Sequence, residues 1–279
     1  MKTSSRILKA LVYFFATLTI LCLAFVILFV LVRGIPYLSP DLFCMKYTSD
    51  NASMFPAMVN TLTMVLLALL AAVPIGIFTA IYLAEYANPK NRIVRIVRVT
   101  ADTLSAIPSI VYGLFGRLFF VIYLKWNISI LAGAMTTAIM ILPLIMRATE
   151  EAILAVPQSL RDASYGLGAG QVRTITKIVV PTAMPGILAG AILGIGRIVG
   201  ETAALLFTSG AVAEIPKKLV GSAAGGRTLA MHMYALSSEG FYVNEAYATG
   251  VVLLVLVLLM NGLSTHFAKK LGKDTGVNE

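Results

Sequence analysis

Long apolar runs are the feature of this chain that most restricts its fold. A helix needs about 20 residues to cross a bilayer, and several runs have roughly that length. Lipid offers no hydrogen-bond partners to the backbone, so each run is predicted to be a transmembrane helix. Six runs occupy residues 11–32, 59–84, 104–124, 129–147, 185–208 and 244–265, and the third and fourth are the least cleanly separated.

The composition agrees with this interpretation. Hydrophobic residues make up 58% of the 279 residues, charged residues make up 13%, and the mean hydropathy is +0.88. These values are far too apolar for a water-soluble domain, and they predict an all-α integral membrane protein. The first run is too long for the apolar part of a signal peptide and lacks an evident cleavage site, so we expect it to be retained.

The net charge of +9 could indicate nucleic-acid binding, but its distribution indicates membrane orientation instead. With the N-terminus in the cytoplasm, 14 Lys and Arg residues fall on that side and six on the other. This bias follows the positive-inside rule. It predicts a multi-pass protein of the cell (inner) membrane with both termini and the polar residues 148–181 in the cytoplasm, in contact with the lipid bilayer and with no nucleic-acid partner.

Residues 148–181, called the polar segment below, form a hydrophilic island between apolar runs. Pro157 interrupts a first helix, and Ser159 with Asp162 can begin the next. The small residues between 163 and 170 allow close approach to another surface. Apolar residues then follow at helical spacing, at Val172, Ile175 and Ile178. We expect a short helix, a glycine turn and a second short helix, shaped to fit a groove on a cytoplasmic partner.

The polar segment resembles the cytoplasmic signature of permeases of ATP-binding cassette (ABC) importers. That signature is Glu-Ala-Ala, three residues, Gly, nine residues, Ile, one residue and Leu-Pro. The matching residues here are Asp162, Ala163, Ser164, Gly168, Ile178, Val180 and Pro181. The spacing is complete, and the three substitutions are conservative. The resemblance implies the type I (MetI-like) importer permease fold, with six transmembrane helices and a coupling loop that docks on a separate ATPase subunit.

The chain offers no site for catalysis of its own. It contains no phosphate-binding loop of the type Gly-x-x-x-x-Gly-Lys-Ser/Thr, and the glycines from 166 to 170 lack the Rossmann spacing. Cys22 and Cys44 lack metal-ligand spacing. We therefore expect a transport subunit that is not an enzyme and binds no cofactor or metal itself, with ATP and Mg in the partner ATPase.

Two charged residues, Arg197 and Glu201, fall near the middle of the fifth run. A charge there costs about 2.5–3.5 kcal/mol on insertion scales, so the presence of two charges in one predicted span requires an explanation. Their spacing of four residues predicts that they share one helix face and pair. Arg197 can bind an oxyanion through its planar donors, and Glu201 can weaken that hold by competing for the guanidinium. The alternative is an ion pair that only fixes helix packing.

Arg147 and Glu150 form a second charged pair, at the inner end of the fourth run. A place on the substrate pathway and ordinary anchoring of a helix end are equal alternatives for them. Arg117, in the third run, is expected to snorkel toward the outer surface. Asp102 and Glu85 lie near the inner boundary and are expected to face water.

Several segments together resemble the PstA-type permeases of phosphate importers over nearly the whole chain. They are Asn60 to Leu62, Pro74 to Glu85, Ile107 to Gly113, Arg147 to Glu150 and Arg197 to Thr208. The resemblance implies a phosphate pathway that includes Arg197, Glu201, Arg147 and Glu150. It also implies a PstC-like second permease, two PstB-like ATPase subunits and a PstS-like phosphate-binding protein outside. Ala204, where a close family version has proline, is a departure expected to affect helix geometry.

By the same resemblance the chain divides into residues 1–57, a permease core at 58–266 and a cytoplasmic tail at 267–279. The outer residues 33–57 and 209–243 predict no separate domain, although they could present a surface to an external protein. Three alternatives remain open at this point. They are a permease for another oxyanion such as sulfate or molybdate, an ATP-independent channel or secondary transporter, and a membrane scaffold that transports nothing.

Overall fold

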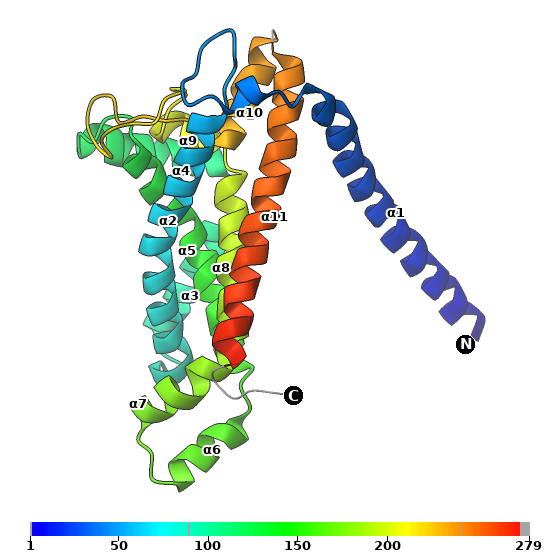
Figure 1. Cartoon of the computed structure of the whole chain (residues 1–279). Helices are drawn as coiled ribbons and strands as arrows, with labels where there is room; N and C mark the ends of the chain where they lie inside the picture. The colour runs from blue at the N-terminus through cyan, green and yellow to red at the C-terminus, as the bar shows by residue number, and fades with distance from the viewer. Residues whose placement is uncertain (1, 89, 241, 274–279) are drawn as a thin grey trace.

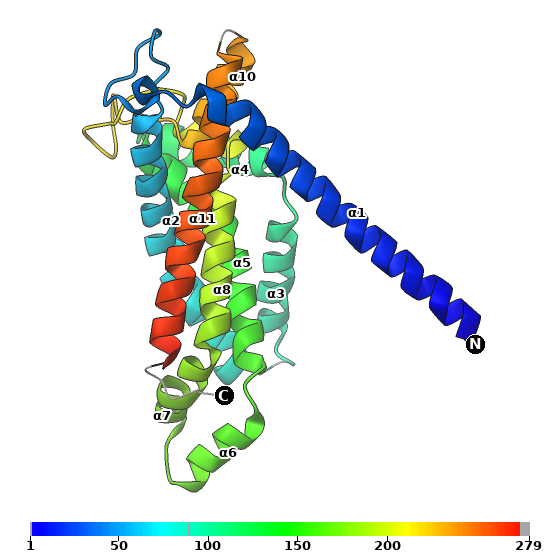
Figure 2. The same ribbon diagram turned by 45° about the vertical axis from the view of Figure 1, so that its right-hand side comes forward.

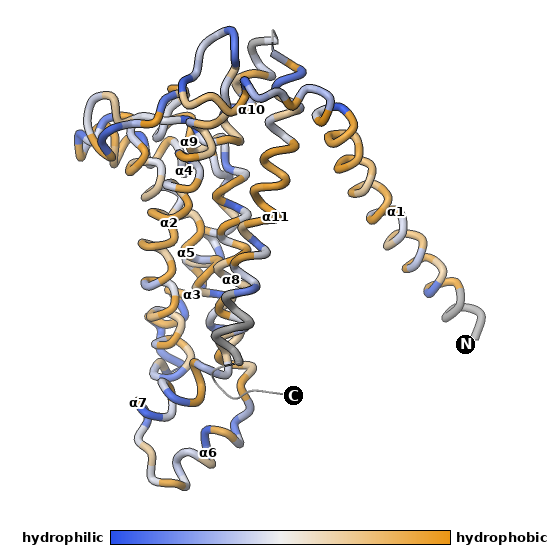
Figure 3. Tube along the Cα trace, in the orientation of Figure 1, coloured by the Kyte–Doolittle hydropathy of each residue, from blue (hydrophilic) through white to orange (hydrophobic). Residues whose placement is uncertain are grey.

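The structure, a computed structural model, describes residues 2–88, 90–240 and 242–273, and in this part the chain is helical and has no strand. Four long helices stand side by side as a bundle (Figure 1), and Figure 3 shows apolar residues along most of their length. They are α2 (Phe55–Ile81), α5 (Ile130–Leu154), α8 (Val180–Val199) and α11 (Val243–Lys273). Five helices in the described part could cross a membrane, or up to six with one bent pair, which confirms the predicted fold class.

Helix α5 is the most buried of the candidate spans. It begins after Ser129, whose hydroxyl accepts a hydrogen bond from the amide of Ala132 at 3.3 Å and so satisfies a free N–H of the first turn. Small residues then let α8 approach closely. A Cβ added to Gly190 would lie 2.6 Å from the Cβ of Ala148, so only glycine fits there.

The third predicted span, at 104–124, is wrong in its start and its shape. Helix α3 (Arg92–Ser105) meets α4 (Ser109–Gly116) and the π-helical turn η4 (Arg117–Tyr123) at a bend of 103°. Pro108 lies at this bend with a ψ of 141°, which is not helical. Because proline has no backbone N–H, it cannot donate the hydrogen bond that would continue helix α3. Figure 2 shows α3 upright beside the bundle. The apolar runs in the sequence do not include α3, because this helix is amphipathic and carries basic residues on its exposed face.

The fifth predicted span, at 185–208, is also interrupted. Helix α8 ends at Val199, and the short helix α9 (Ala203–Thr208) begins only after Thr202, whose backbone is not helical. Toward its start, α8 is preceded by α7 (Gln171–Thr174) and the π-helical turn η5 (Ile175–Val179). The spanning element is therefore 171–199. The break occupies only Gly200, Glu201 and Thr202, and apolar residues resume at Ala203, so the segment resembles one continuous span in hydropathy.

The two ends of the bundle differ. Helix α6 (Gln158–Gly166) and α7 project beyond one end, called the α6 end below (Figure 1). The opposite end, called the α10 end, carries α9, α10 (Leu229–Glu239) and the short turns η1 (Ile35–Tyr37) and η2 (Pro40–Phe43). The predicted tail at 267–279 is helical as far as Lys273, and 274–279 lie outside the described residues.

Helix α1 (Lys2–Gly34) leaves the bundle at an angle in both views (Figures 1 and 2). Near its C-terminal end, the ring of Phe29 packs edge-on against Tyr247 of α11, with 5.9 Å between the ring centroids. A Cβ on Gly34 would lie 2.4 Å from the carbonyl oxygen of Tyr247, so this end is closely fitted. The most apolar part of α1 is not buried at all, which leaves its surface for lipid or another membrane subunit.

Candidate substrate pathway and coupling surface

Arg197 lies in the last turn of α8, near the α10 end rather than at the middle of its span. Its side chain is half-buried, and its guanidinium has no hydrogen bond or ion pair with any described residue. A half-buried guanidinium without a partner anion among the described residues is suited to bind an oxyanion.

The prediction that Arg197 and Glu201 pair on one helix face is wrong. Because α8 ends at Val199, Glu201 lies beyond the helix, and its Oε1 accepts a hydrogen bond from the amide of Ala204 at 3.0 Å. This buried carboxylate therefore satisfies a free N–H at the start of α9. The bond also gives the departure at Ala204 a physical meaning, because proline at this position would have no N–H to donate.

Arg147 and Glu150 pair with α3 and not with each other. The Oε1 of Glu150 lies 2.7 Å from the Nη2 of Arg98, and Arg147 pairs with Asp102. The Glu150 side chain is 10% exposed, whereas those of Arg147 and Asp102 are 43% and 49% exposed. The same Nη2 of Arg98 also donates to the carbonyl of Leu83 at 3.3 Å. Asp102 thus faces water in part, as expected, but it also forms an ion pair with Arg147, a predicted residue of the substrate pathway.

The expectation that Glu85 faces water is wrong. Glu85 belongs to the π-helical turn η3 (Tyr82–Tyr86) that follows α2, and its side chain is only 8% exposed. Its Oε1 lies 2.8 Å from the Nη2 of Arg161 in α6. The two residues stand 76 positions apart, so no local pattern could have revealed the pair.

The polar segment folds as the predicted helix, glycine turn and helix. Pro157, rather than Ser159, is the residue that precedes α6, and Gly168 has a φ of +82°, a left-handed conformation that glycine adopts without strain. The hydroxyls of Ser164 and Thr174 lie 2.8 Å apart in the interior and close the turn. Two of the other signature residues, Asp162 and Ala163, are exposed. The remaining three are half-buried, namely Ile178, Val180 and Pro181.

A hollow of about 390 Å³ opens in the surface of the polar segment. Arg173 and Lys177 lie at this hollow together with Leu167, which is 90% exposed at the tip. The expected apolar face is divided, because Ile175 is buried while Val172 is exposed. Exposed apolar side chains next to cations make a surface suited to a soluble protein partner.

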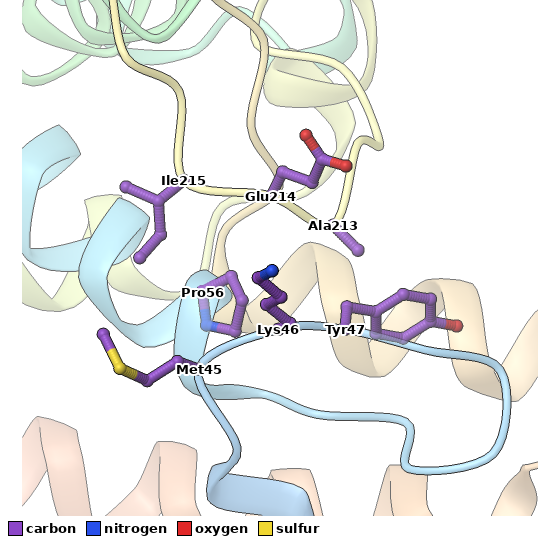
Figure 4. Close-up of a pocket in the computed structure, with 7 residues that line it drawn as sticks. All are labelled: Met45, Lys46, Tyr47, Pro56, Ala213, Glu214 and Ile215. Atoms are coloured by element: carbon purple, nitrogen blue, oxygen red, sulfur yellow. The ribbon is translucent and has the colours of Figure 1, made fainter.

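A second hollow, also of about 390 Å³, lies at the α10 end between two loops (Figure 4). Lys46 and Tyr47 come from one loop and Glu214 from the other. The side-chain amide of Asn60 in α2 holds the second loop, since it donates to the carbonyls of Glu214 at 2.9 Å and Arg227 at 3.2 Å. The outer segments therefore form a shaped polar surface on the bundle.

Beside this hollow, the guanidinium of Arg227 stacks over the ring of Tyr47, 4.6 Å from its centroid. His232 of α10 is buried behind them, with its Nε2 3.2 Å from the carbonyl oxygen of Ala52. Burial, and then the charge of Arg227, lower the pKa of His232 to about 3. His232 is therefore a neutral packing group near pH 7.

The family of the chain follows from its sequence. Residues 72–273 match the family model described as binding-protein-dependent transport system inner membrane component. The chain belongs to this family. The family description, a component of transport systems in the inner membrane, agrees with the apolar helices.

Individual relatives extend over most of the chain. It is 35% identical to the phosphate transport system permease protein PstA of Pasteurella multocida, with 84% of each chain covered. It is 31% identical to PstA of Haemophilus influenzae, with 93% and 92% covered, and 33% identical to a probable ABC transporter permease, YqgI, of Bacillus subtilis, with 87% and 89% covered. The expected resemblance to PstA-type permeases is confirmed.

Solved structures share the fold. A chain of a bacterial alginate ABC transporter, crystallised with an alginate-bound periplasmic protein, is similar with a TM-score of 0.69 at 18% identity, covering 94% of this chain and 95% of that one. A chain of the inward-facing MetNI methionine ABC transporter is similar with a TM-score of 0.61 at 20% identity, covering 78% and 94%. At these identities the likeness shows the fold alone, which is that of ABC importer permeases.

Proposed function

We propose that this chain is the permease subunit of an ATP-driven phosphate importer, where it forms half of the transmembrane pathway. The observation that carries the proposal is the 35% identity to a PstA permease over 84% of both chains. The partners are then a PstC-like permease, two PstB-like ATPase subunits that bind ATP and Mg, and a PstS-like binding protein. The alginate transporter, whose structure includes a periplasmic protein, supports an assembly of this kind.

Arg197 is the anion-binding residue of this pathway. Its guanidinium lacks a protein partner among the described residues, so phosphate does not have to displace a carboxylate to reach it. An arginine stays protonated and offers parallel donors to two phosphate oxygens. Glu201 contributes through the start of α9, because its carboxylate is engaged with the amide of Ala204.

Arg147 and Glu150 belong to the same pathway nearer the α6 end. Arg147 is half exposed and holds Asp102, so an arriving phosphate competes with that carboxylate for the guanidinium. Competition between Asp102 and phosphate for the Arg147 guanidinium weakens phosphate binding there. Weaker binding suits transport, because a substrate that binds too tightly is not released. Glu150 keeps α3 in place through Arg98 while this exchange occurs.

The orientation follows from the positive-inside rule, with the α6 end and both termini in the cytoplasm. In this orientation the surface that includes Asp162, Ala163, Gly168 and Ile178 meets the ATPase, and Ser164 and Pro181 support it from within. The hollow at Lys46, Tyr47 and Glu214 then faces the binding protein outside.

The test is uptake of labelled phosphate into proteoliposomes that hold this chain with its candidate partners, with sulfate as competitor. We expect uptake that requires ATP, resists sulfate and collapses in Arg197→Gln, while the ATPase still co-purifies. Arg117→Gln is the matched control, because Arg117 is exposed on η4 and has no interaction with a described residue. Uptake without ATP, or inhibition by sulfate, would contradict the proposal.

A further inference from the structure

One buried polar network joins the polar segment to the bundle. Both the Nε and the Nη2 of Arg161 donate to the Oε1 of Glu85, at 3.3 Å and 2.8 Å. Nη1 of Arg161 donates to the carbonyl of Val156 at 2.6 Å, and Nη2 also donates to that of Ile153 at 2.9 Å. The guanidinium of Arg161 thus binds one carboxylate and two backbone carbonyls.

The partners of Arg161 come from different helices. Glu85 follows α2, whereas the two carbonyls lie at and just beyond the C-terminal end of α5. Gln171, the first residue of α7, donates from its Nε2 to the backbone carbonyl of Glu85 at 3.0 Å. Helices on both sides of the glycine turn are therefore fastened to the bundle at the same point.

The glycine turn itself has no packing contacts that could stiffen it. A Cβ added to Gly166, Gly168 or Gly170 would meet no atom within 4 Å, so nothing packs on this turn. The contact of Ser164 with Thr174 closes the turn on itself and does not reach α2 or α5. The direct side-chain contacts of α6 with η3 and with the end of α5 are those of Arg161, so a push on α6 is expected to reach α2 and α5 through this residue.

The network also connects with the charged pair on the pathway. The carbonyl of Leu83, two residues before Glu85, accepts a hydrogen bond from Arg98, which pairs with Glu150. Glu150 precedes Ile153 by three residues on α5, within one helical turn of an acceptor of Arg161. The contacts thus form a closed ring from α6 through η3, α3 and α5 back to α6.

A buried ion pair is poor evidence for stability, because apolar residues of similar volume often serve as well or better. Its planar fork, however, fixes the direction and distance between the elements that it joins. Glu85 lies within a π-helical turn, a feature that is frequent at functional sites. These features fit a mechanical link.

We propose that Glu85 and Arg161 are positioning residues that transmit the movement of α6 to α2 and α5, and through Arg98 to the pathway. This inference rests on the proposed function and adds the route of coupling. When the ATPase subunits close and push α6, the ion pair moves the ends of α2 and α5 with it. The strength of the coupling between ATP hydrolysis and transport then depends on this pair.

The first test uses the full complex in proteoliposomes and measures phosphate transported per ATP hydrolysed. We expect Glu85→Gln to lower this ratio about tenfold, within the usual range of coupling between sites, while the ATPase subunit stays bound and hydrolyses ATP. Glu151→Gln is the matched control, because Glu151 is an exposed carboxylate on α5, and it should leave the ratio unchanged. An unchanged ratio in Glu85→Gln would overturn the inference.

Arg161→Lys is a milder variant for the case that Glu85→Gln does not assemble. Lysine keeps the positive charge but cannot form the fork, so the ratio should fall in the same direction by a smaller factor. A native ratio in this variant would also overturn the inference. Failure of the native complex to take up phosphate with ATP is a different outcome, which would contradict the proposed function.

The second test measures the movement directly and does not depend on phosphate. Spin labels are placed at Tyr165 of α6 and Tyr86 of η3, both exposed, in a chain whose exposed Cys22 and Cys44 are replaced by serine. The distance between labels should be the same in the nucleotide-free and ATP-trapped complex, and it should change between these states in Glu85→Gln. A change of equal size in both proteins would exclude a rigid link.

Discussion

The carboxylate of Glu150 lies 2.7 Å from the guanidinium of Arg98. Glu150, a predicted residue of the substrate pathway, is therefore paired with helix α3. Arg147 and Asp102 make a second pair between the same two helices, with the opposite polarity. A shift of α3 along α5 by one turn would bring Arg98 opposite Arg147, and the like charges would repel. The two pairs therefore fix the register of α3 on the bundle.

The pair of Arg98 with Glu150, whose carboxylate is buried, should contribute more to stability than the exposed pair of Arg147 with Asp102. Glu150→Gln leaves the cation of Arg98 with a weaker partner, and we expect it to lower the free energy of unfolding by about 1–3 kcal/mol. Thermal inactivation of the purified protein in detergent measures this loss. Glu151→Gln, at an exposed position of the same helix, should show no comparable loss, and equal losses in the two variants would contradict the prediction.

The pair of Arg147 with Asp102 should affect transport more than stability. Because both side chains are more than 40% exposed, Asp102→Asn should cost less than about 1 kcal/mol of unfolding free energy. Asp102→Asn also frees the Arg147 guanidinium, so phosphate should be held more tightly and the Michaelis constant for uptake should fall. Chemical denaturation measures the unfolding free energy, and kinetics of ATP-driven uptake measure the Michaelis constant. A raised Michaelis constant would show that Asp102 does not compete with the substrate.

The sequence predicts those parts of the fold that depend on local pattern. Long apolar runs predict α2, α5 and α11, and the spacing from Asp162 to Pro181 predicts the helix, glycine turn and helix of the polar segment. It does not predict α3, because an amphipathic helix with several arginines lacks the hydropathy of a span.

The contacts of the candidate site were not predictable for a different reason. Arg98 and Glu150 stand far apart in the chain, as do Glu85 and Arg161, so only the tertiary fold shows that they pair. The supposed pairing of Arg197 with Glu201 failed because it assumed a continuous helix. The break after Val199 depends on the backbone at Thr202, which hydropathy does not record.

The role of Glu201 at the start of α9 leads to a specific expectation. Glu201→Gln keeps an oxygen that can accept the amide of Ala204, so its effect on stability should be small. Glu201→Ala removes that acceptor and should cost about 0.5–2 kcal/mol, the usual cost of losing a helix N-terminal cap. Chemical denaturation in mild detergent would separate the two variants. Equal losses would show that the negative charge matters rather than the hydrogen bond.

His232 should make stability depend on pH below neutrality. Burial and Arg227 lower its pKa from 6.5 to about 3, so the unfolded chain binds a proton in this range that the folded protein does not bind. Stability should therefore fall as the pH drops below about 6.5, with a slope approaching about 1.4 kcal/mol per pH unit from this residue. Melting temperatures from pH 7.5 to 5 would measure the slope. His232→Gln should flatten it, and an unchanged slope in this variant would assign it to other groups.

Gly168 and Gly166 allow a matched comparison on the coupling surface, because a Cβ at either would meet no atom within 4 Å. Only Gly168 has a positive φ, of +82°, so alanine there strains the backbone by roughly 1–2 kcal/mol, whereas Gly166 ends α6 in an ordinary helical conformation. Gly168→Ala should therefore weaken association with the ATPase subunit severalfold, and Gly166→Ala should leave it close to native. Binding of detergent-solubilised permease to the immobilised ATPase measures the difference. Equal weakening would mean that the extra methyl group obstructs the docked surface, and equal retention would mean that the conformation at Gly168 is not needed for docking.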